Sequence, residues 1–273
     1  MLTGGDLISD IDGCAVGSGE LALWWLGQHS FVVKAGGKVL YFDPFLSPLV
    51  HRQIPPLLSP RQINHADLIL GTHDHIDHID RAVWPVLADA SPQAKFVIPG
   101  LLCERLADDL RIPAGRFVGA DDGVTVEVDG VRITGIAAAH EFLDRDPATG
   151  RYPYLGYVVE AGGCTLYHAG DTCIYEGLQT KLKRRRLDVM FLPINGRDAK
   201  RLGSGCIGNM TYQEAADLAG ALEPGLVVPA HWDMFASNPG DPSAFAEYMR
   251  VKYPHLRACI CKHGQCVRFV RPR

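Results

Sequence analysis

Short apolar segments separated by turn-forming residues dominate the first half of the chain. Each is three to six residues long and rich in Val, Ile, Leu and aromatic side chains, which is typical of buried strands. Asp129-Gly130 lies between two of them and predicts a tight hairpin turn. Residues 80–87 and 101–110 are instead predicted to be helical. The predicted strands are 21–26, 31–33, 38–42, 66–71, 95–98, 124–128 and 131–136.

In the second half, the pattern restarts and strands alternate with helices. Thr211 and Glu214 have the spacing of a capping box, which predicts the start of one helix. Pro242 suits the first helical position of another. The predicted helices are 174–186, 211–222 and 242–253, and the predicted strands are 154–160, 164–168, 187–194 and 226–230, with 258–262 and 266–270 as a closing hairpin.

The two halves, roughly 20–140 and 141–270, are similar in this pattern but not in sequence. Sheets that bury one face against each other and cover the other face with helices would explain both halves. We therefore predict an α/β (α+β) fold, a four-layer αββα sandwich. The sequence contains no linker and no low-complexity segment, so we expect a single domain over residues 1–273.

Composition narrows the class of protein. The hydrophobic fraction of 47% and the charged fraction of 21% are those of a globular protein. A net charge of −4 argues against binding to nucleic acid, and no apolar run is long enough for a membrane span. The eight cysteines are scattered and no secretory signal is apparent, so we expect reduced thiols and a cytoplasmic protein. The sequence is compatible with a homo-oligomer as well as with a monomer.

A cluster of histidines and carboxylates directly follows the predicted strand 66–71. It reads His73-Asp74-His75-Ile76-Asp77-His78. Neutral imidazole and carboxylate together suit zinc, manganese or iron, and the absence of cysteine argues against a structural thiolate site. Packing alone does not require such a set of side chains. The segment therefore predicts a metal site on a loop at the end of a strand.

Four further candidates occupy the same position, at the end of a predicted apolar strand. They are Asp43, His140, Asp171 and His231. Because strand ends of one sheet meet at a common edge, we expect these side chains to converge with the 73–78 cluster on one rim. Five histidines lack this context, and we assign them to structure or surface: His29, His51, His65, His255 and His263.

The combined set resembles the signature of the metallo-β-lactamase superfamily of hydrolases. The resemblance extends over nearly the whole chain, from Trp24 to about Val270. It implies an αββα sandwich with a metal-dependent hydrolase site. Within the superfamily, four segments resemble one branch in particular, which contains L-ascorbate-6-phosphate lactonase and related metal-dependent hydrolases. These segments are 24–27, 72–75, 166–171 and 231–233.

The resemblance also implies a ligand set for one or two divalent ions. Zn²⁺ is the first choice and Mn²⁺ the alternative, since nitrogen and oxygen ligands admit both. Asp77 and Asp171 are the predicted catalytic carboxylates. Asp43 and His168 are predicted to orient the ligands without binding metal themselves. The implied ligands are His73, His75 and His140 for the first ion, Asp77, His78 and His231 for the second, and Asp171 between the two.

A metal-bound hydroxide that attacks a small anionic substrate is the mechanism that the resemblance implies. A phosphorylated sugar lactone is the specific candidate. The loop after the predicted strand 187–194 carries polar and basic residues on a glycine-rich backbone. We predict that it binds the anionic end of the substrate. The predicted substrate-binding residues are Asn195, Arg197, Lys200 and Arg201.

Three alternatives remain. A phosphodiesterase or nuclease with the same fold is disfavoured by the acidic net charge. An oxidoreductase of the flavodiiron type is disfavoured because its pattern resembles His-x-Glu-x-Asp, whereas this chain has His75 in place of the glutamate. A non-catalytic binding protein is the third, and it has no evident need for the seven implied ligands.

Overall fold

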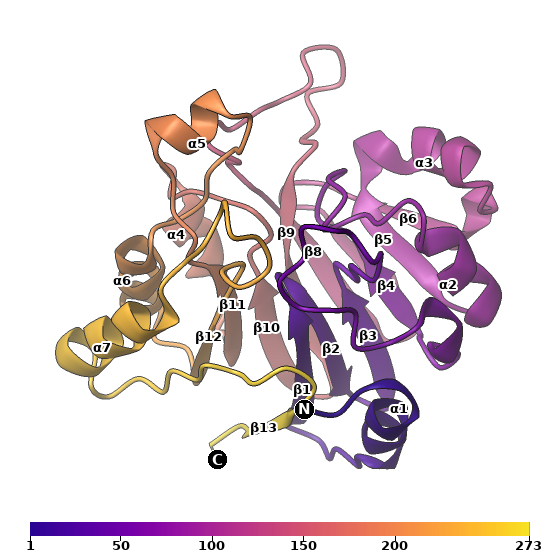
Figure 1. The fold of residues 1–273 in the computed structure, drawn as a ribbon, viewed down its shortest axis with the longest axis horizontal. Helices are drawn as coiled ribbons and strands as arrows, with labels where there is room; N and C mark the ends of the chain where they lie inside the picture. The colour runs from indigo at the N-terminus through magenta and orange to yellow at the C-terminus, as the bar shows by residue number, and fades with distance from the viewer. Residues whose placement is uncertain (273) are drawn as a thin grey trace.

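The computed structural model describes residues 1–272 and shows two mixed β-sheets packed face to face, with helices outside (Figure 1). The predicted four-layer sandwich is confirmed. The first sheet lies in the order β13 (Cys266–Val270), β1 (Glu20–Gly27), β2 (Ser30–Ala35), β3 (Lys38–Phe42), β4 (Leu68–Leu70), β5 (Lys95–Pro99) and β6 (Phe117–Ala120). The second lies in the order β12 (Leu226–Ala230), β11 (Val189–Pro193), β10 (Cys164–His168), β9 (Leu155–Ala161), β8 (Val131–Ala137) and β7 (Thr125–Val128).

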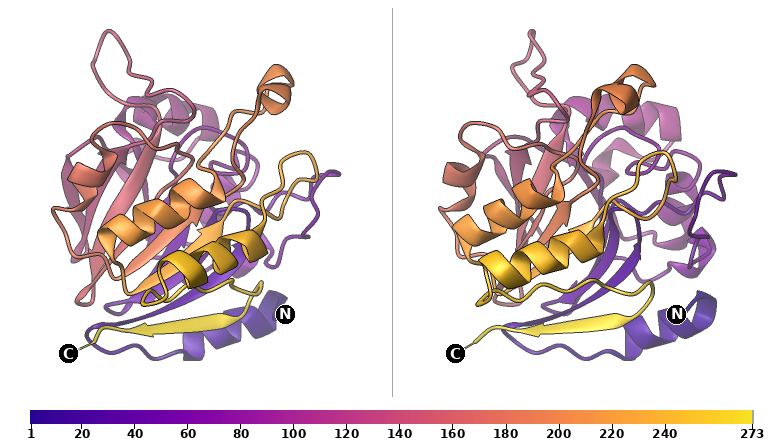
Figure 2. Two further views of the ribbon diagram at one scale, coloured as in Figure 1. Left: turned by 90° about the vertical axis from the view of Figure 1, so that its left-hand side faces the viewer. Right: turned by 60° about the vertical axis from the view of Figure 1, so that its left-hand side comes forward.

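Helices cover the outer face of each sheet. Those beside the first sheet are α1 (Gly4–Gly13), α2 (Trp84–Ala90) and α3 (Cys103–Leu110), with 3-10 turns at Pro60–Gln62, Gly100–Leu102 and Ala114–Arg116. Those beside the second are α4 (Leu178–Leu182), α6 (Tyr212–Leu222) and α7 (Pro242–Lys252), the last two side by side (Figure 2). Helix α5 (Ala199–Gly203) lies apart from them, at the top of Figure 1. None of the helices within residues 1–272 combines the length and apolar character that a membrane span requires.

Alternation along the strands explains the layers. In β1, Leu21, Leu23 and Trp25 pack into the cluster between the two sheets. The intervening Trp24 and Leu26 pack into the cluster beneath the helices of the first sheet. Because both faces are buried, such a strand is a continuous apolar run rather than an alternating one, as the sequence shows.

Local sequence signals predicted several elements correctly. The Asp129-Gly130 turn joins β7 to β8, and both residues have positive φ values, of 50° and 81°, as a type I′ hairpin turn requires. Helix α6 begins after Thr211, and its capping box with Glu214 is formed. Helix α7 has Pro242 in its first turn.

Two predicted helices are wrong in extent. The helix predicted over 174–186 is only α4, because Gly177 adopts a left-handed conformation with φ of 95° immediately before it. The helix predicted over 80–87 begins at Trp84, so that Pro85 falls in the first turn, where its missing N–H is tolerated. Asp80 does not cap it and instead accepts hydrogen bonds from Leu46 and Ser47. Elements α1, β6 and α5 were not predicted.

The closing hairpin is also wrong. Strand β13 pairs antiparallel with β1, while residues 258–262 form no strand. This segment crosses from one sheet to the other: Ala258 forms a bridge with Val227 of β12, and His263 forms one with Trp25 of β1. Because this segment connects the two sheets, it does not pair with β13 as the predicted hairpin would require.

Substitution of Gly162 by alanine should destabilise the fold through a contact between the two sheets. Gly162 has φ of 57°, and an added Cβ would meet the backbone of Gly36 in the opposite turn. Gly130 has φ of 81° but open space around it. We expect a loss of roughly 1 kcal/mol for alanine at Gly130 from backbone strain, and a further 1–3 kcal/mol or so at Gly162 from overpacking. Denaturant unfolding of both variants measures the difference, and equal losses would contradict the importance of this contact.

Candidate metal centre

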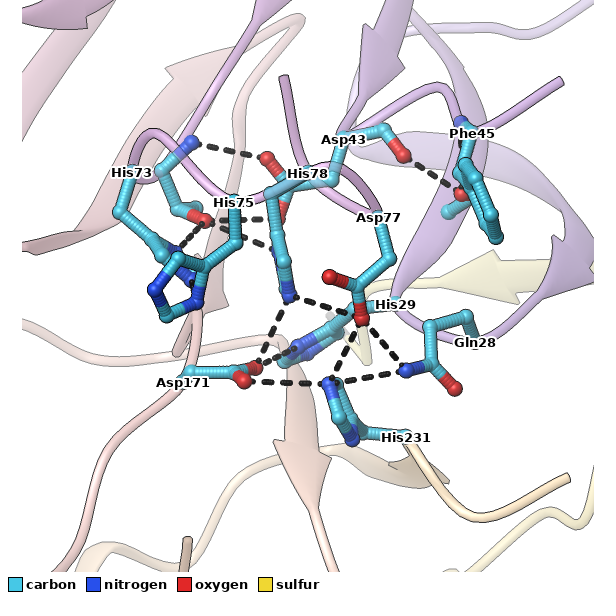
Figure 3. Close-up of polar contacts among 12 residues, drawn as sticks. Gln28, His29, Asp43, Phe45, His73, His75, Asp77, His78, Asp171 and His231 are labelled. Carbon is cyan, nitrogen blue, oxygen red and sulfur yellow. Dashed lines mark hydrogen bonds and ion pairs between the residues drawn. The ribbon is translucent and has the colours of Figure 1, made fainter. Parts of the chain in front are cut away.

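Loops at one rim of the sandwich carry all seven predicted ligands. The loop after β4 supplies four of them, and the others follow β8, β10 and β12. Strands β10, β11 and β12 run parallel, so their carboxyl ends meet at the same edge. Figure 3 shows ligand side chains from both sheets pointing toward one another. The strand-end argument therefore identified residues that the fold places together.

One group of ligand atoms consists of His73, His75 and His140, whose ring nitrogens lie within 4.8 Å of one another. His73 Nε2 is 2.9 Å from His75 Nδ1. His140 Nδ1 lies 3.2 Å from the carbonyl oxygen of Gly208, and its Nε2 faces the group. Three convergent imidazole nitrogens are a common arrangement for a divalent metal ion.

A second group consists of Asp77, His78 and His231, again with ligand atoms within 4.8 Å of one another. Asp77 Oδ2 is 3.6 Å from His78 Nε2 and 3.5 Å from His231 Nε2. The two imidazoles come from different sheets, since His78 follows β4 and His231 follows β12. One carboxylate and two imidazoles also suit a divalent ion.

Asp171 lies between the two groups. Its Oδ1 is 3.3 Å from His78 Nε2, and its Oδ2 is 3.0 Å from His231 Nε2 and 3.7 Å from His140 Nε2. Both oxygens therefore face the second group, and Oδ2 also faces the first, so this carboxylate could bridge two ions. The bridging role that the resemblance implies for Asp171 stays a prediction.

Buried polar atoms without hydrogen-bond partners indicate that this cluster fits cations. Among residues 1–272, His78 Nε2 and Asp171 Oδ1 are both fully buried and neither makes a hydrogen bond. Orphaned buried groups of this kind are costly and uncommon in folded proteins. A divalent cation would satisfy them, and the set of imidazole nitrogens and carboxylate oxygens suits zinc and manganese.

The histidines of the first group are neutral at physiological pH. Burial lowers the pKa of His73 well below its usual value, and it also lowers the pKa values of His75 and His140. Each ring therefore keeps an unprotonated nitrogen. This is the form that a metal ion requires, so metal binding to this group displaces few protons.

The second group differs in charge. Burial opposes a positive charge on His231, but Asp171 and Asp77 outweigh it and raise its pKa to about 9. The same balance, with Asp171, Asp77 and Asp43, raises the pKa of His78. In the metal-free protein these imidazoles therefore hold protons where an ion would bind.

Affinity of the second group for metal should consequently rise with pH. A metal ion must displace the proton of His231 at any pH below about 9, which weakens binding by about tenfold per pH unit for each proton displaced. The first group should show little of this dependence above pH 7. Calorimetric titration of metal-free protein with Mn²⁺ between pH 6 and 8 separates the two. Two binding steps with the same pH dependence would contradict this assignment of protons.

Asp43, predicted to hold a ligand in place, contacts His78 of the second group from the side away from Asp77 and Asp171. It is fully buried, and its Oδ2 is 2.6 Å from His78 Nδ1. It also accepts hydrogen bonds from the Thr72 N–H and from Thr72 Oγ1, both at 2.8 Å. Because His78 donates from Nδ1, its Nε2 is directed toward Asp77 and Asp171 (Figure 3).

His29 lies between His168 and Asp171, so His168 is further from the ligands than we predicted. Its Nε2 faces the carbonyl oxygen of His29 at 2.9 Å, and the two rings pack with centroids 4.1 Å apart. His29 Nδ1 in turn lies 3.7 Å from Asp171 Oδ1. His29 is fully buried, so of the two roles assigned to it the structure excludes the surface one, and its place beside Asp171 was not predicted. His29 and Gln28 follow Gly27 at the end of β1, so the strand-end rule that found the other candidates applies to them too.

Two basic residues of the loop after β11, Arg197 and Arg201, have partners within the protein. Arg197 donates to both carboxylate oxygens of Glu214, at 2.7 and 2.8 Å. Arg201 pairs with Asp198 and also donates to the Asn195 carbonyl oxygen and to Asn238 Oδ1. These contacts argue against the predicted role of Arg197 and Arg201 in substrate binding.

The cavity over the metal ligands supports the same conclusion. It has a volume of about 320 Å³. Of residues 1–272, those that line it include no lysine or arginine, and Asn195, Arg197, Lys200 and Arg201 are outside the set. Besides the ligands His75, Asp77, His140, Asp171 and His231, the lining residues are Ile76, Gly205, Cys206, Ile207, Phe235, Ser237 and Asn238.

Comparison with known proteins supports this view of the fold. The sequence model described as "Beta-lactamase superfamily domain" matches residues 38–232. The structure of Igni18, a novel metallo hydrolase from Ignicoccus hospitalis, superposes with a TM-score of 0.72. That match covers 92% of this chain and 98% of the other at 23% identity, and at this identity it shows the fold alone.

Two curated relatives extend over most of the chain. A protein of Pyrococcus abyssi is 32% identical over 243 residues, covering 88% of this chain and 96% of the relative. A protein of Caldivirga maquilingensis is 28% identical over 243 residues, covering 89% and 95%. Both bear the name UPF0173 metal-dependent hydrolase. The chain therefore belongs to the beta-lactamase superfamily and, within it, to the UPF0173 family.

Proposed function

We propose that the protein is a metal-dependent hydrolase of a small acyl substrate such as a lactone or ester. The observation that carries this proposal is a pair of ligand groups that share Asp171 and open onto one cavity. The names of the curated relatives agree with it. A binding protein would have no evident use for seven convergent ligands and two carboxylates held ionised.

Two divalent ions, with Zn²⁺ as first choice and Mn²⁺ as second, would be held by the two groups. Such a pair would lower the pKa of a bound water molecule toward neutrality and would polarise the substrate bond that is attacked. The protein's own part is to hold the ligands in place and to keep Asp77 and Asp171 ionised. Burial would raise the pKa values of both aspartates, but the positive charges of His78 and His231 outweigh it and lower them.

Asp77 is best placed to move a proton. Its side chain is 15% exposed and lines the cavity, whereas the Asp171 side chain is 4% exposed. As an ionised carboxylate, Asp77 can accept a proton from the attacking water and return it to the leaving oxygen. Asp77 thus serves both as a ligand and as the acid–base group.

The cavity favours an uncharged substrate over the anionic one predicted from sequence. Ile76, Ile207 and Phe235 give it an apolar wall, while Ser237 and Asn238 supply neutral polar groups. A small lactone or ester combines an apolar body with one polar, hydrolysable group, which is the usual match for such a pocket. The similarity to the ascorbate-6-phosphate lactonase branch rests on sequence motifs and supports the lactone but not its phosphate.

A matched pair of substrates tests the proposal. Protein stripped of metal and protein reconstituted with Zn²⁺ or Mn²⁺ are assayed on a neutral sugar lactone, on its phosphorylated counterpart, on a phosphodiester and on a β-lactam. We expect metal-dependent turnover of the neutral lactone, with the phosphorylated form slower. Turnover of the phosphodiester alone would favour the phosphodiesterase alternative. Metal binding without turnover of any of the four would contradict the proposed hydrolase.

A further inference from the structure

Gln28 has its side-chain amide between two metal ligands. Its Nε2 is 2.7 Å from Asp77 Oδ2 and 3.0 Å from His231 Nε2 (Figure 3). The residue is 2% exposed, so the amide is withdrawn from bulk solvent. The sequence signals and the curated names assign no role to this residue. An amide nitrogen donates to a carboxylate without adding negative charge, which makes it suitable for fixing Asp77 beside Asp171.

The backbone of Gln28 is held as firmly as its side chain. Its φ of 54° is left-handed, which costs a residue with a Cβ on the order of 1 kcal/mol. The surrounding hydrogen bonds fix this conformation. Gln28 N–H donates to Asp233 Oδ1 at 2.9 Å, and its carbonyl oxygen accepts from the His231 N–H at 2.9 Å and from Trp25 Nε1 at 3.0 Å. Strain that is overdetermined in this way is characteristic of functional positions.

The two ligands that Gln28 contacts come from different sheets. Asp77 lies in the loop after β4 of the first sheet, and His231 directly follows β12 of the second. Gln28 directly follows β1 of the first sheet. Its carbonyl oxygen accepts from the His231 N–H, and its amide nitrogen lies 3.0 Å from His231 Nε2. Its side chain therefore determines how far apart these ligands stand across the junction of the sheets.

The frame around Gln28 extends to the C-terminal segment. Asp233, which accepts from the Gln28 N–H, also lies 2.7 Å from His263 Nε2. The His263 ring stacks on Trp25, with centroids 4.3 Å apart. The first ligand group has other supports: Thr72 Oγ1 lies 3.1 Å from His73 Nδ1, and the Gly208 carbonyl oxygen faces His140. Loss of the Gln28 amide should therefore affect one group and not the other.

We propose that Gln28 is a positioning residue that sets the separation of Asp77 and His231 and so controls metal affinity at the second ligand group alone. The inference rests on the two-ion arrangement of the proposed function. Residues that hold metal ligands from outside typically change affinity by 10- to 100-fold when replaced. We expect that loss at the Asp77–His78–His231 group and less than about a twofold change at the three-histidine group.

The test is titration of the metal-free protein with Co²⁺, followed by calorimetry and by the visible spectrum, which reports ligand geometry. Gln28→Met keeps the size of the side chain and removes the amide. Gln28→Asn keeps the amide but shortens its reach, and it serves if the methionine variant does not fold. The matched control is Gln179→Met, at an exposed glutamine on α4. Thermal unfolding of each metal-free variant checks the fold.

In wild type and Gln179→Met we expect two binding steps with the same affinities. In the Gln28 variants, the second step should weaken by 10- to 100-fold and its spectrum should change, while the first step stays the same. Unchanged second-step affinity, or equal weakening of both steps, would overturn the inference, and so would a wild-type protein that binds one ion only. Two-step binding without turnover of any substrate would contradict the proposed hydrolase but leave Gln28's role measurable.

Discussion

Replacement of Asp171 by asparagine should abolish turnover and reduce the metal content to at most one ion per chain. Its two carboxylate oxygens face ligands of both groups, at 3.3 Å from His78 of the second group and 3.7 Å from His140 of the first. An amide of the same shape presents one oxygen and no negative charge, so it cannot serve two cations. We expect kcat to fall by more than about a thousandfold, as when an essential member of a catalytic unit is removed. Elemental analysis and steady-state kinetics measure the two effects.

Asp188→Asn is the matched control for this variant. Asp188 is also a buried aspartate of the second sheet, but it accepts hydrogen bonds from the Thr165 N–H and from Arg271, away from the cavity. Its replacement should lower the free energy of unfolding and leave metal content and kcat near wild type. Normal metal content and activity in Asp171→Asn would refute the assignment of Asp171 as the shared ligand.

The second large effect is expected for Asp77→Asn, which should lower kcat by about a hundredfold or more. The carboxylate lines the cavity and is kept ionised by His78 and His231, so it can accept a proton that an amide cannot. Loss of a positioned acid–base group typically costs 10²- to 10⁴-fold or so. The fold should persist, because asparagine retains the size of the side chain. Kinetics across pH 5 to 9 and thermal unfolding measure both expectations.

Asp74→Asn provides the control from the same loop. Asp74 pairs with Arg81 and Arg105 and does not line the cavity over the ligands, so its replacement should leave kcat near the wild-type value. An Asp77→Asn enzyme with near-normal kcat and an unchanged pH–rate profile would show that Asp77 moves no proton.

The convergence of these side chains was predictable because a simple physical rule governs their position. Parallel strands end at a common edge, so polar side chains that follow apolar runs are placed together whatever their distance in sequence. His140 and His231 carry no local signal beyond that position. Gln28 follows the same rule, but an amide is not recognised as a metal-site residue until its distance from Asp77 is known.

The substrate loop could not be predicted because the partners of its charges lie elsewhere in the chain. Arg197 looked free in the sequence, yet Glu214 neutralises it while also forming the capping box of α6. The pairing of β13 with β1 is likewise non-local. In both cases the local pattern is compatible with more than one partner, and packing decides between them.

The most direct test of the account is the number of metal ions bound by the wild-type chain. Metal-free protein is titrated with Zn²⁺, dialysed against metal-free buffer and subjected to elemental analysis. The arrangement of His73, His75 and His140 beside Asp77, His78 and His231, with Asp171 between them, predicts two ions per chain. A protein that retains one ion or none after reconstitution, with either Zn²⁺ or Mn²⁺, would contradict the account.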